Sequence, residues 1–185
     1  MDGIGIFIAI VVAIAISVAV LYNRLVGKRQ LARSGWSDID VQLKRRADLV
    51  PQIVGAVRGY AAHERALFEE IAERRSAALS AGDDPKARGA AEQALGRPLS
   101  RVVALAESYP ALKANENFLA VQRQLAETED KIEMARRYYN GAVRELNTLV
   151  HSVPSNVIAN AFGFKEAAYF EIGDGDRAAP GVSHE

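Results

Sequence analysis

The sequence predicts an all-α protein in which an N-terminal transmembrane helix leads into a long antiparallel helical bundle of the four-helix-bundle type. Three observations predict this class: an uncharged apolar run near the N-terminus, heptad-spaced apolar residues along most of the remainder, and strong helix-breaking signals between the expected helices. We expect residues 1–22 to be the membrane anchor, 23–172 the bundle and 173–185 a disordered tail. About 150 residues are enough for one domain with an apolar core.

The first element is predicted to cross a bilayer. From Gly3 to Tyr22 the sequence has no charged residue, and at about 1.5 Å per residue this run spans about 30 Å, the hydrocarbon thickness of a membrane. Ser17 is its only clearly polar side chain, and its hydroxyl can bond a carbonyl one turn earlier. Tyr22 stands at the expected aqueous edge, where an amphipathic ring is favoured.

A cleaved signal peptide is the alternative interpretation of this run. Ser17 and Ala19 form a weak small-x-small cleavage site, but the segment before the run carries Asp2 and no Lys or Arg. The run is also longer than a typical signal-peptide core. An uncleaved, single-pass anchor is therefore favoured.

The flanking charges predict the orientation of the chain. Only Asp2 precedes the run, whereas the residues that follow include Arg24, Lys28, Arg29 and Arg33. Because basic residues stay on the cytoplasmic side, the body is expected in the cytoplasm of a bacterial cell. We expect Tyr22, Arg24, Lys28 and Arg29 to lie at the membrane interface and to meet lipid headgroups.

A first body helix is predicted from Trp36, continuous to Leu79 if Pro51 only kinks it. A coiled-coil-like heptad ladder runs through Trp36, Leu43, Val50, Val57, Ile71 and Ala78, with Glu64 as its polar exception. A companion seam runs through Ile39, Ala47, Ile53 or Val54, Tyr60 or Ala61, and Leu67 or Phe68. Such a stripe is typical of helices that pack side by side. Pro51 removes one donor, so a kink is expected there and a break is the alternative.

Two further helices are predicted after a break at residues 80–85. Asp84 is placed to cap the second helix, which should run from Pro85 to Ser108, although Gly96 and Pro98 disturb its middle. Asn115 is expected to cap the third helix, which should end before Pro154. Its two ladders are Phe118, Leu125, Ile132, Tyr139 and Leu146, and Val121, Thr128, Ala135, Ala142 and Leu149. Thr128 is expected to bond its own backbone.

A short fourth helix is expected over Ser155–Ala161. The aromatic residues Phe162, Phe164, Tyr169 and Phe170 would follow it as a plug that closes the end of the bundle. Docking on another molecule is the alternative for these rings, but so small a bundle needs its end closed.

Composition and motifs argue against catalysis and against nucleic-acid binding. The 23 basic and 23 acidic residues balance, and no Cys is present for thiolate chemistry. The histidines His63, His151 and His184 are scattered and lack zincin or di-iron spacing, so no metal or cofactor site is expected. The carboxylates Glu127, Glu129, Asp130 and Glu133 are expected on a solvated face, paired with Lys131, Arg136 and Arg137.

Two clusters are candidate partner contacts. Lys44, Arg45 and Arg46 form the densest basic cluster, and a solvated face paired with Asp40 and Asp48 is the alternative interpretation. Arg136, Arg137 and Tyr138 combine cations with an aromatic ring, as protein interfaces often do. Ordinary helix packing explains them equally well.

Three long motifs resemble the LemA family of bacterial membrane proteins. They are WSDIDVQLKRRADLVPQIVGAVRGYAAHE, ESYPALKANENFLAVQRQLAETEDKIEMARRYYN and SVPSNVIANAFGF, and the resemblance extends from Leu21 to about Glu171. It implies an N-terminal transmembrane helix, a cytoplasmic body and an antiparallel helical bundle. It supplies no catalytic residues. It also implies membrane proteins as partners, because some relatives are associated with a membrane metalloprotease and one branch acts in magnetosome membrane formation.

The leading functional hypothesis is a membrane-anchored, non-enzymatic scaffold or adaptor that engages protein partners. The alternative is a self-assembling homo-oligomer that organises or remodels the bacterial membrane. A hydrolase would need a pocket with convergent polar groups, for which regular heptads leave little room.

Overall fold

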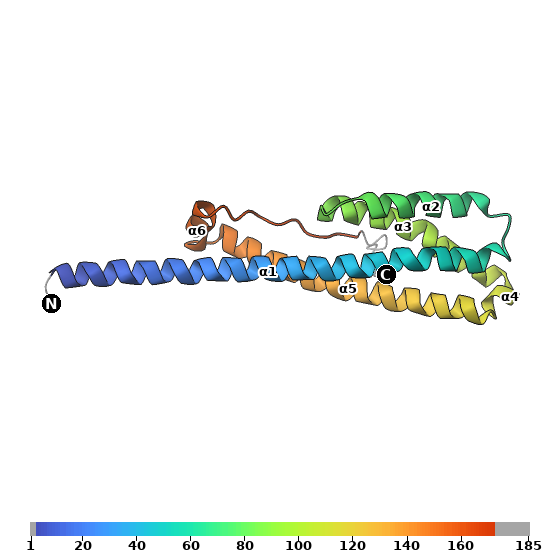
Figure 1. The fold of residues 1–185 in the computed structure, drawn as a ribbon, viewed down its shortest axis with the longest axis horizontal. Helices are drawn as coiled ribbons and strands as arrows, with labels where there is room; N and C mark the ends of the chain where they lie inside the picture. Colours follow the sequence, from blue (N-terminus) through green and yellow to red (C-terminus); the bar gives the residue numbers. More distant parts are fainter. Residues whose placement is uncertain (1–2, 173–185) are drawn as a thin grey trace, which may run out of the picture. The chain divides into compact units, whose positions relative to one another are not determined.

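The structure, a computed structural model, describes residues 3–172 and is helical throughout its regular elements (Figure 1). The helices are α1 (Gly3–Arg58), α2 (Arg65–Ser80), α3 (Pro85–Leu105), α4 (Pro110–Lys113), α5 (Glu116–His151) and α6 (Ser155–Ala161), with a 3₁₀ turn η1 (Ala106–Ser108) after α3. No strand occurs among the described residues, and the predicted all-α class is confirmed. The predicted tail over 173–185 lies outside them.

The first body helix ends earlier than predicted. Neither a break at Pro51 nor continuity to Leu79 is correct, because α1 continues through Pro51 to Arg58 and α2 begins at Arg65. Pro51 cannot donate to the carbonyl of Ala47, one turn earlier. The Nε of Arg75 on α2 donates to that carbonyl at 2.6 Å instead. A tertiary contact thus replaces the missing helical bond, and α1 continues.

The second and third predicted helices are present with their predicted starts. The Oδ2 atom of Asp84 accepts from the backbone N–H of Ala87 at 2.9 Å and caps α3. The Oδ1 atom of Asn115 accepts from the backbone N–H of Phe118 at 3.0 Å, ahead of α5. Pro98 lies inside α3 without ending it. Helix α4 was not predicted, because Tyr109 and Pro110 indicated only an end.

The two ladders of α5 define its buried side. Every member of the first ladder is buried, namely Phe118, Leu125, Ile132, Tyr139 and Leu146. The second ladder is buried at Thr128 and Ala142 and half-buried at its other positions. Thr128 donates to the carbonyl of Gln124 at 2.7 Å, the predicted backbone bond. The heptad spacing therefore predicted this face correctly.

The chain separates into two compact units, each of which takes part of α1 and part of α5. Unit 1 comprises Met1–Val41 and Lys131–Tyr169, and unit 2 comprises Gln42–Asp130 and Phe170–Glu185.

In unit 1, the two long helices pack antiparallel. Lys28 pairs with Glu145, while Gly35 lies against Tyr138, so positions rise along α1 as they fall along α5. The core of this unit comprises Leu25, Leu146, Ala159 and Phe164.

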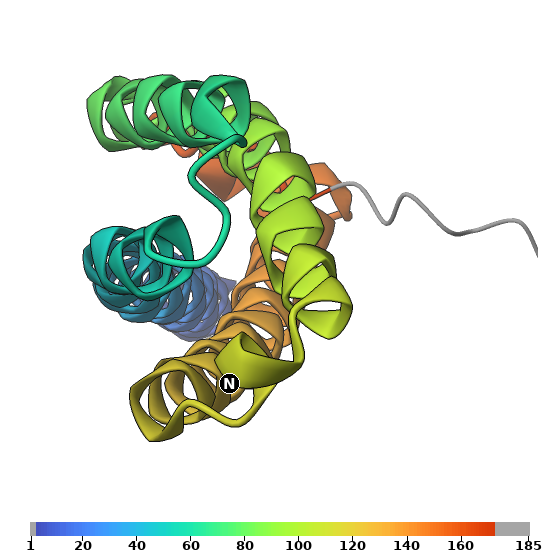
Figure 2. The ribbon, with the colours of Figure 1, turned by 90° about the vertical axis from the view of Figure 1, so that its right-hand side faces the viewer.

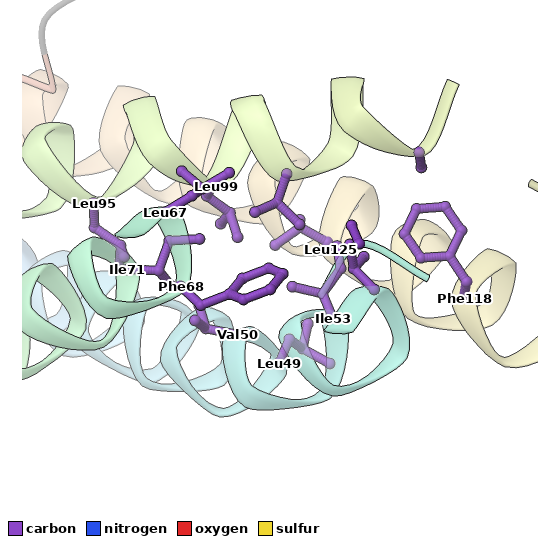
Figure 3. Packing of buried hydrophobic residues seen from close by; sticks show 14 of the residues in the cluster. Leu49, Val50, Ile53, Leu67, Phe68, Ile71, Leu95, Leu99, Phe118 and Leu125 are labelled. Carbon is purple, nitrogen blue, oxygen red and sulfur yellow. The ribbon is translucent and has the colours of Figure 1, made fainter. Parts of the chain in front are cut away.

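Unit 2 has an apolar core to which α1, α2, α3 and α5 all contribute (Figure 2). Figure 3 shows Val50 and Ile53 of α1 beside Phe68 of α2, with Leu95 and Leu99 of α3 above them. Ala47 and Phe68 of the predicted seams are buried with them. The seams were predicted on one helix, and the turn over residues 59–64 places them on two.

The predicted aromatic plug does not form. Phe164 is buried in the core of unit 1, and Phe170 is fully buried in unit 2. Phe162 is 56% exposed, so it closes no core. The extended segment after Gly163 separates these rings, which a helical continuation would have kept together.

Candidate functional site

No residue of the apolar run of α1 is buried, and most of the run is exposed. Helix α1 is long enough and apolar enough to cross a membrane, and none of its most apolar 18-residue window is buried. The hydroxyl of Ser17 donates to the carbonyl of Ala13 at 2.8 Å, as predicted for a polar side chain in an apolar segment. A surface so large and so apolar is unfavourable in water. Its composition and exposure are those of a lipid-facing helix.

Aromatic rings gather where the apolar run of α1 ends. The Tyr22 ring lies 4.9 Å from the Phe162 ring and 5.8 Å from the Phe164 ring, between centroids. The guanidinium of Arg29 lies over the Phe164 ring, 4.7 Å from its centroid. Leu25, one turn before Arg29, is fully buried against Phe164. This end of unit 1 therefore combines rings with cations, a combination found at membrane interfaces.

The remaining predicted interface cations differ in their surroundings. Arg24 is exposed. Lys28 pairs with Glu145 of α5, and hydrogen bonding to Lys28, together with its charge, holds the pKa of the Glu145 carboxyl below its usual value. Contact of Tyr22, Arg24, Lys28 and Arg29 with lipid stays a prediction.

A buried ionic cluster lies in unit 2, centred on Arg46. Its Nη1 atom donates to the Oε1 atom of Glu129 at 3.1 Å, and its Nη2 atom donates to the backbone carbonyl of Glu92 at 3.2 Å and pairs with that residue's carboxylate. Arg88 Nε donates to the other carboxylate oxygen of Glu92 at 3.1 Å. Arg46, Arg88 and Glu92 are all buried.

This cluster corrects two predictions. Arg46 was predicted on the surface as a partner contact, or paired with Asp40 and Asp48, but it is buried and pairs with other carboxylates. Glu129 was predicted on a solvated face with cations of its own helix, but it pairs with Arg46. Glu133 does pair with Arg137, as predicted.

The electrostatics of the cluster favour a permanently charged Arg46. Burial alone would lower the pKa of its guanidinium, but the charges of Glu129 and Glu92 and their hydrogen bonds outweigh burial and raise it. Both oxygens of Glu92 are engaged by guanidinium groups. A carboxylate held in this way is poorly placed to take a proton from a substrate.

An open groove of about 840 Å³ lies beside the cluster, lined in part by Arg46, Gly96, Leu99, Leu125 and Glu129. Its other polar side chains are those of Gln93, Arg97, Ser100 and Arg101. Arg101 pairs with Glu70, and the hydroxyl of Ser100 donates to the carbonyl of Gly96. Elsewhere in residues 3–172, no three His, Asp or Glu side chains gather in a way that could hold a metal ion. His184 lies outside the described residues.

The other candidate partner contacts lie mostly on the surface. Lys44 and Arg45 are exposed on α1 in unit 2. In unit 1, Arg137 is exposed, Arg136 is half-buried and Tyr138 is 50% exposed. The structure thus brings Arg137 and Tyr138 to one exposed stretch of α5, whereas Arg46 is buried away from Lys44 and Arg45.

Sequence reasoning missed Arg88 and Glu92, although a signal exists. Glu92 stands three residues before Leu95 and seven before Leu99, both buried, so it shares their helix face. Arg88 precedes Glu92 by four residues, the spacing of a helical ion pair. A charged pair on an apolar stripe indicates a buried partner, here Arg46.

Comparison with known proteins gives the following matches. The model of the LemA family matches residues 35–184. The chain is 26% identical over 186 residues to the magnetosome proteins MamQ 1 and MamQ 2 of Paramagnetospirillum magneticum, covering 87% of this chain and 68% of each relative. It is 24% identical over 174 residues to the magnetosome protein MamQ of Magnetospirillum gryphiswaldense, covering 80% of this chain and 64% of that relative.

Proposed function

The chain belongs to the LemA family, and from this premise we propose that it is a membrane-anchored, non-enzymatic scaffold or adaptor whose helical body engages protein partners. The proposal rests on the observation that α1 is a single helix from Gly3 to Arg58. One helix begins as an exposed, uncharged run and continues past Tyr22 into the packed helices of the body. A partner held by the body is then coupled to the bilayer through one continuous helix.

The body is proposed to face the cytoplasm. Arg24, Lys28 and Arg29 follow the span within about two helical turns, whereas the residue just before it, Asp2, is acidic. Basic residues at this distance also meet anionic headgroups, which attract each cation near the surface by about 1 kcal/mol.

The absence of a catalytic role is proposed from the chemistry of the ionic cluster. Glu92 is held by two guanidinium groups and Glu129 by one, so their charges are satisfied within the protein. The proposal assigns this cluster to packing and assigns function to the surface.

The proposed partner surface comprises Met134, Arg137 and Tyr138 on α5. Met134 is 61% exposed and lies one turn before Tyr138, so the two share a face. The Tyr138 ring rests on Gly35 of α1, with its Cδ1 atom 3.0 Å from where a β-carbon would stand. An exposed Met and a supported Tyr beside an Arg match the composition of protein interfaces.

In-cell photocrosslinking tests this proposal. A photoreactive side chain at position 134 or 138 of the full chain should capture the same few proteins, by mass spectrometry of the adducts. Leu119, also exposed on α5 but in unit 2, is the matched control and should not capture them. Capture that is equal at all three positions, or absent at 134 and 138, would contradict the proposed surface.

A self-assembling oligomer that organises the membrane is the second candidate. The relatives named as magnetosome proteins favour it. Adducts of the chain with itself at position 138, together with ordered arrays of the full chain on liposomes by electron microscopy, would favour this function over a one-to-one adaptor.

A further inference from the structure

Exposed apolar side chains lie on the short helix α6 and beside both of its ends. Val153, Val157 and Phe162 are 82%, 63% and 56% exposed. Val157 lies on the side of α6 opposite the buried Ser155 and Ala159, whereas Val153 precedes the helix and Phe162 follows its last residue. The hydroxyl of Ser155 donates to the carbonyls of Leu149 and Ser152, at 2.7 and 2.9 Å. Helix α6 thus turns two small residues inward and Val157 outward, the reverse of a helix that faces water.

A ring contact places Phe162 beside the end of the membrane span. Tyr22 is the last residue of the uncharged run, and its ring lies 4.9 Å from the Phe162 ring. Figure 1 shows α6 alongside this part of α1 within unit 1. Phe162 therefore joins the end of the span, and the exposed Val157 lies five residues before it.

Basic side chains lie near Tyr22, Phe162 and Phe164. Arg29 lies over Phe164, Arg24 is exposed within a turn of Tyr22, and Lys165 is exposed next to Phe164. An apolar surface rimmed by cations and aromatic rings suits the boundary between acyl chains and anionic headgroups, which is about 5–10 Å deep. A helix of seven residues is about 10 Å long, so α6 fits within that layer.

We propose that the surface formed by Val153, Val157 and Phe162 is a second membrane contact, inserted into the interfacial layer of the leaflet that Tyr22 reaches. This inference rests on the anchoring role proposed for α1. Its occupant is the lipid bilayer, because Phe162 packs on Tyr22, the last residue of the span. A second contact beside the span restricts the tilt and rotation of α1 relative to the membrane.

The absence of Cys from the chain allows a direct test. The full chain with Val157→Cys or Phe162→Cys, labelled with an environment-sensitive fluorophore, is reconstituted into vesicles of phosphatidylcholine and phosphatidylglycerol. A nitroxide placed high on the acyl chain should quench both labels several-fold more than a label at Val41→Cys. Val41 is similarly exposed, but it lies on α1 about 28 Å beyond Tyr22. Aqueous iodide should instead quench the label at position 41 more strongly than the labels at positions 157 and 162.

Two outcomes would overturn the inference. Labels at 157 and 162 that iodide reaches as easily as the label at 41 would place α6 in water. Labels shielded from both quenchers would mean that protein, such as a second copy, covers the surface. Because Val157 takes no part in the ring contacts with Tyr22, its variant keeps the test valid if Phe162→Cys alters the fold.

A label at Ile8→Cys separates this inference from the proposed anchor. Ile8 lies within the span, so its label should be quenched by the nitroxide. Quenching at position 8 with iodide access at 157 contradicts only the second contact, whereas loss of quenching at position 8 contradicts the anchor itself.

Discussion

Arg46 acts in unit 2 as part of the packing, because its guanidinium is buried between the carboxylates of Glu92 and Glu129. The desolvation cost of a buried ion pair is offset by the attraction between its charges only when both partners are present. Glu92 also holds Arg88, so the loss of Arg46 would leave a buried network incomplete rather than remove a surface charge.

We expect Arg46→Met to lower the free energy of unfolding by about 3 kcal/mol, because it leaves Glu92 with one fewer guanidinium partner. Thermal unfolding of the detergent-solubilised full chain, followed by circular dichroism, measures the change. Arg45→Met is the matched control, since Arg45 is exposed on the same helix, and it should change stability by less than about 0.5 kcal/mol. Equal effects of the two variants would show that the cluster contributes nothing.

Gly89 marks a close approach of the C-terminal segment to α3. A β-carbon there would stand 2.3 Å from the carbonyl oxygen of Glu171, a backbone atom that cannot rotate away. Gly96, on the same helix, has nothing within 4 Å of its β-carbon position.

Gly89→Ala and Gly96→Ala should therefore have opposite effects on stability. Alanine stabilises a helix interior by about 0.5–1 kcal/mol relative to glycine, so Gly96→Ala should raise the melting temperature. Gly89→Ala should lower it, because Glu171 must move and Phe170, which is fully buried, moves with it. A rise of similar size in both variants would contradict the close approach.

Among the elements, the segment after α6 depends most on contacts that are distant in sequence. Asn147 of α5 donates to the carbonyl of Ala167 at 3.0 Å and accepts from the backbone N–H of the same residue at 2.9 Å. The hydroxyl of Tyr139 donates to the carbonyl of Ala168 at 2.8 Å. These side chains replace the backbone partners that a helix or a sheet would have provided.

Asn147→Ala should release this segment from α5. The variant leaves the N–H and the carbonyl of Ala167 without their partner, at a cost of about 2 kcal/mol. Limited proteolysis of the full chain should then cut within residues 163–170 sooner than in the parent protein. Thr148→Ala is the control, because Thr148 is exposed and bonds only its own helix through Arg144. Unchanged cleavage in Asn147→Ala would contradict the proposed role of these bonds.

For the whole molecule, the asymmetry of charge around the span makes the orientation testable. Labelling with a membrane-impermeant maleimide in spheroplasts should modify Gly3→Cys and leave Ser80→Cys unmodified until the cells are lysed. Ser80 is exposed at the end of α2, so burial cannot protect it. Labelling of Ser80→Cys before lysis would place the body outside the cytoplasm and reverse the proposed orientation.

The sequence by itself determined the helical class, the exposed apolar run of α1, the caps at Asp84 and Asn115, the buried face of α5 and the bounds of α6. Each of these depends on local propensity, or on a period that one helix repeats many times. The end of α1 at Arg58 was not predictable in this way. The cap position of α2, Glu64, makes no side-chain bond, and Pro51 was the stronger breaking signal.

Tertiary structure alone decided the partners of side chains that are far apart in sequence. Arg75 completes the backbone at Ala47, and Arg46 joins Glu92 across 46 positions. Phe164 and Phe170 are buried in different cores, and Phe162 packs on Tyr22 at the end of the span. The physical reason is that charge and apolarity are visible in each residue, whereas burial, pairing and exposure depend on which distant segment lies opposite.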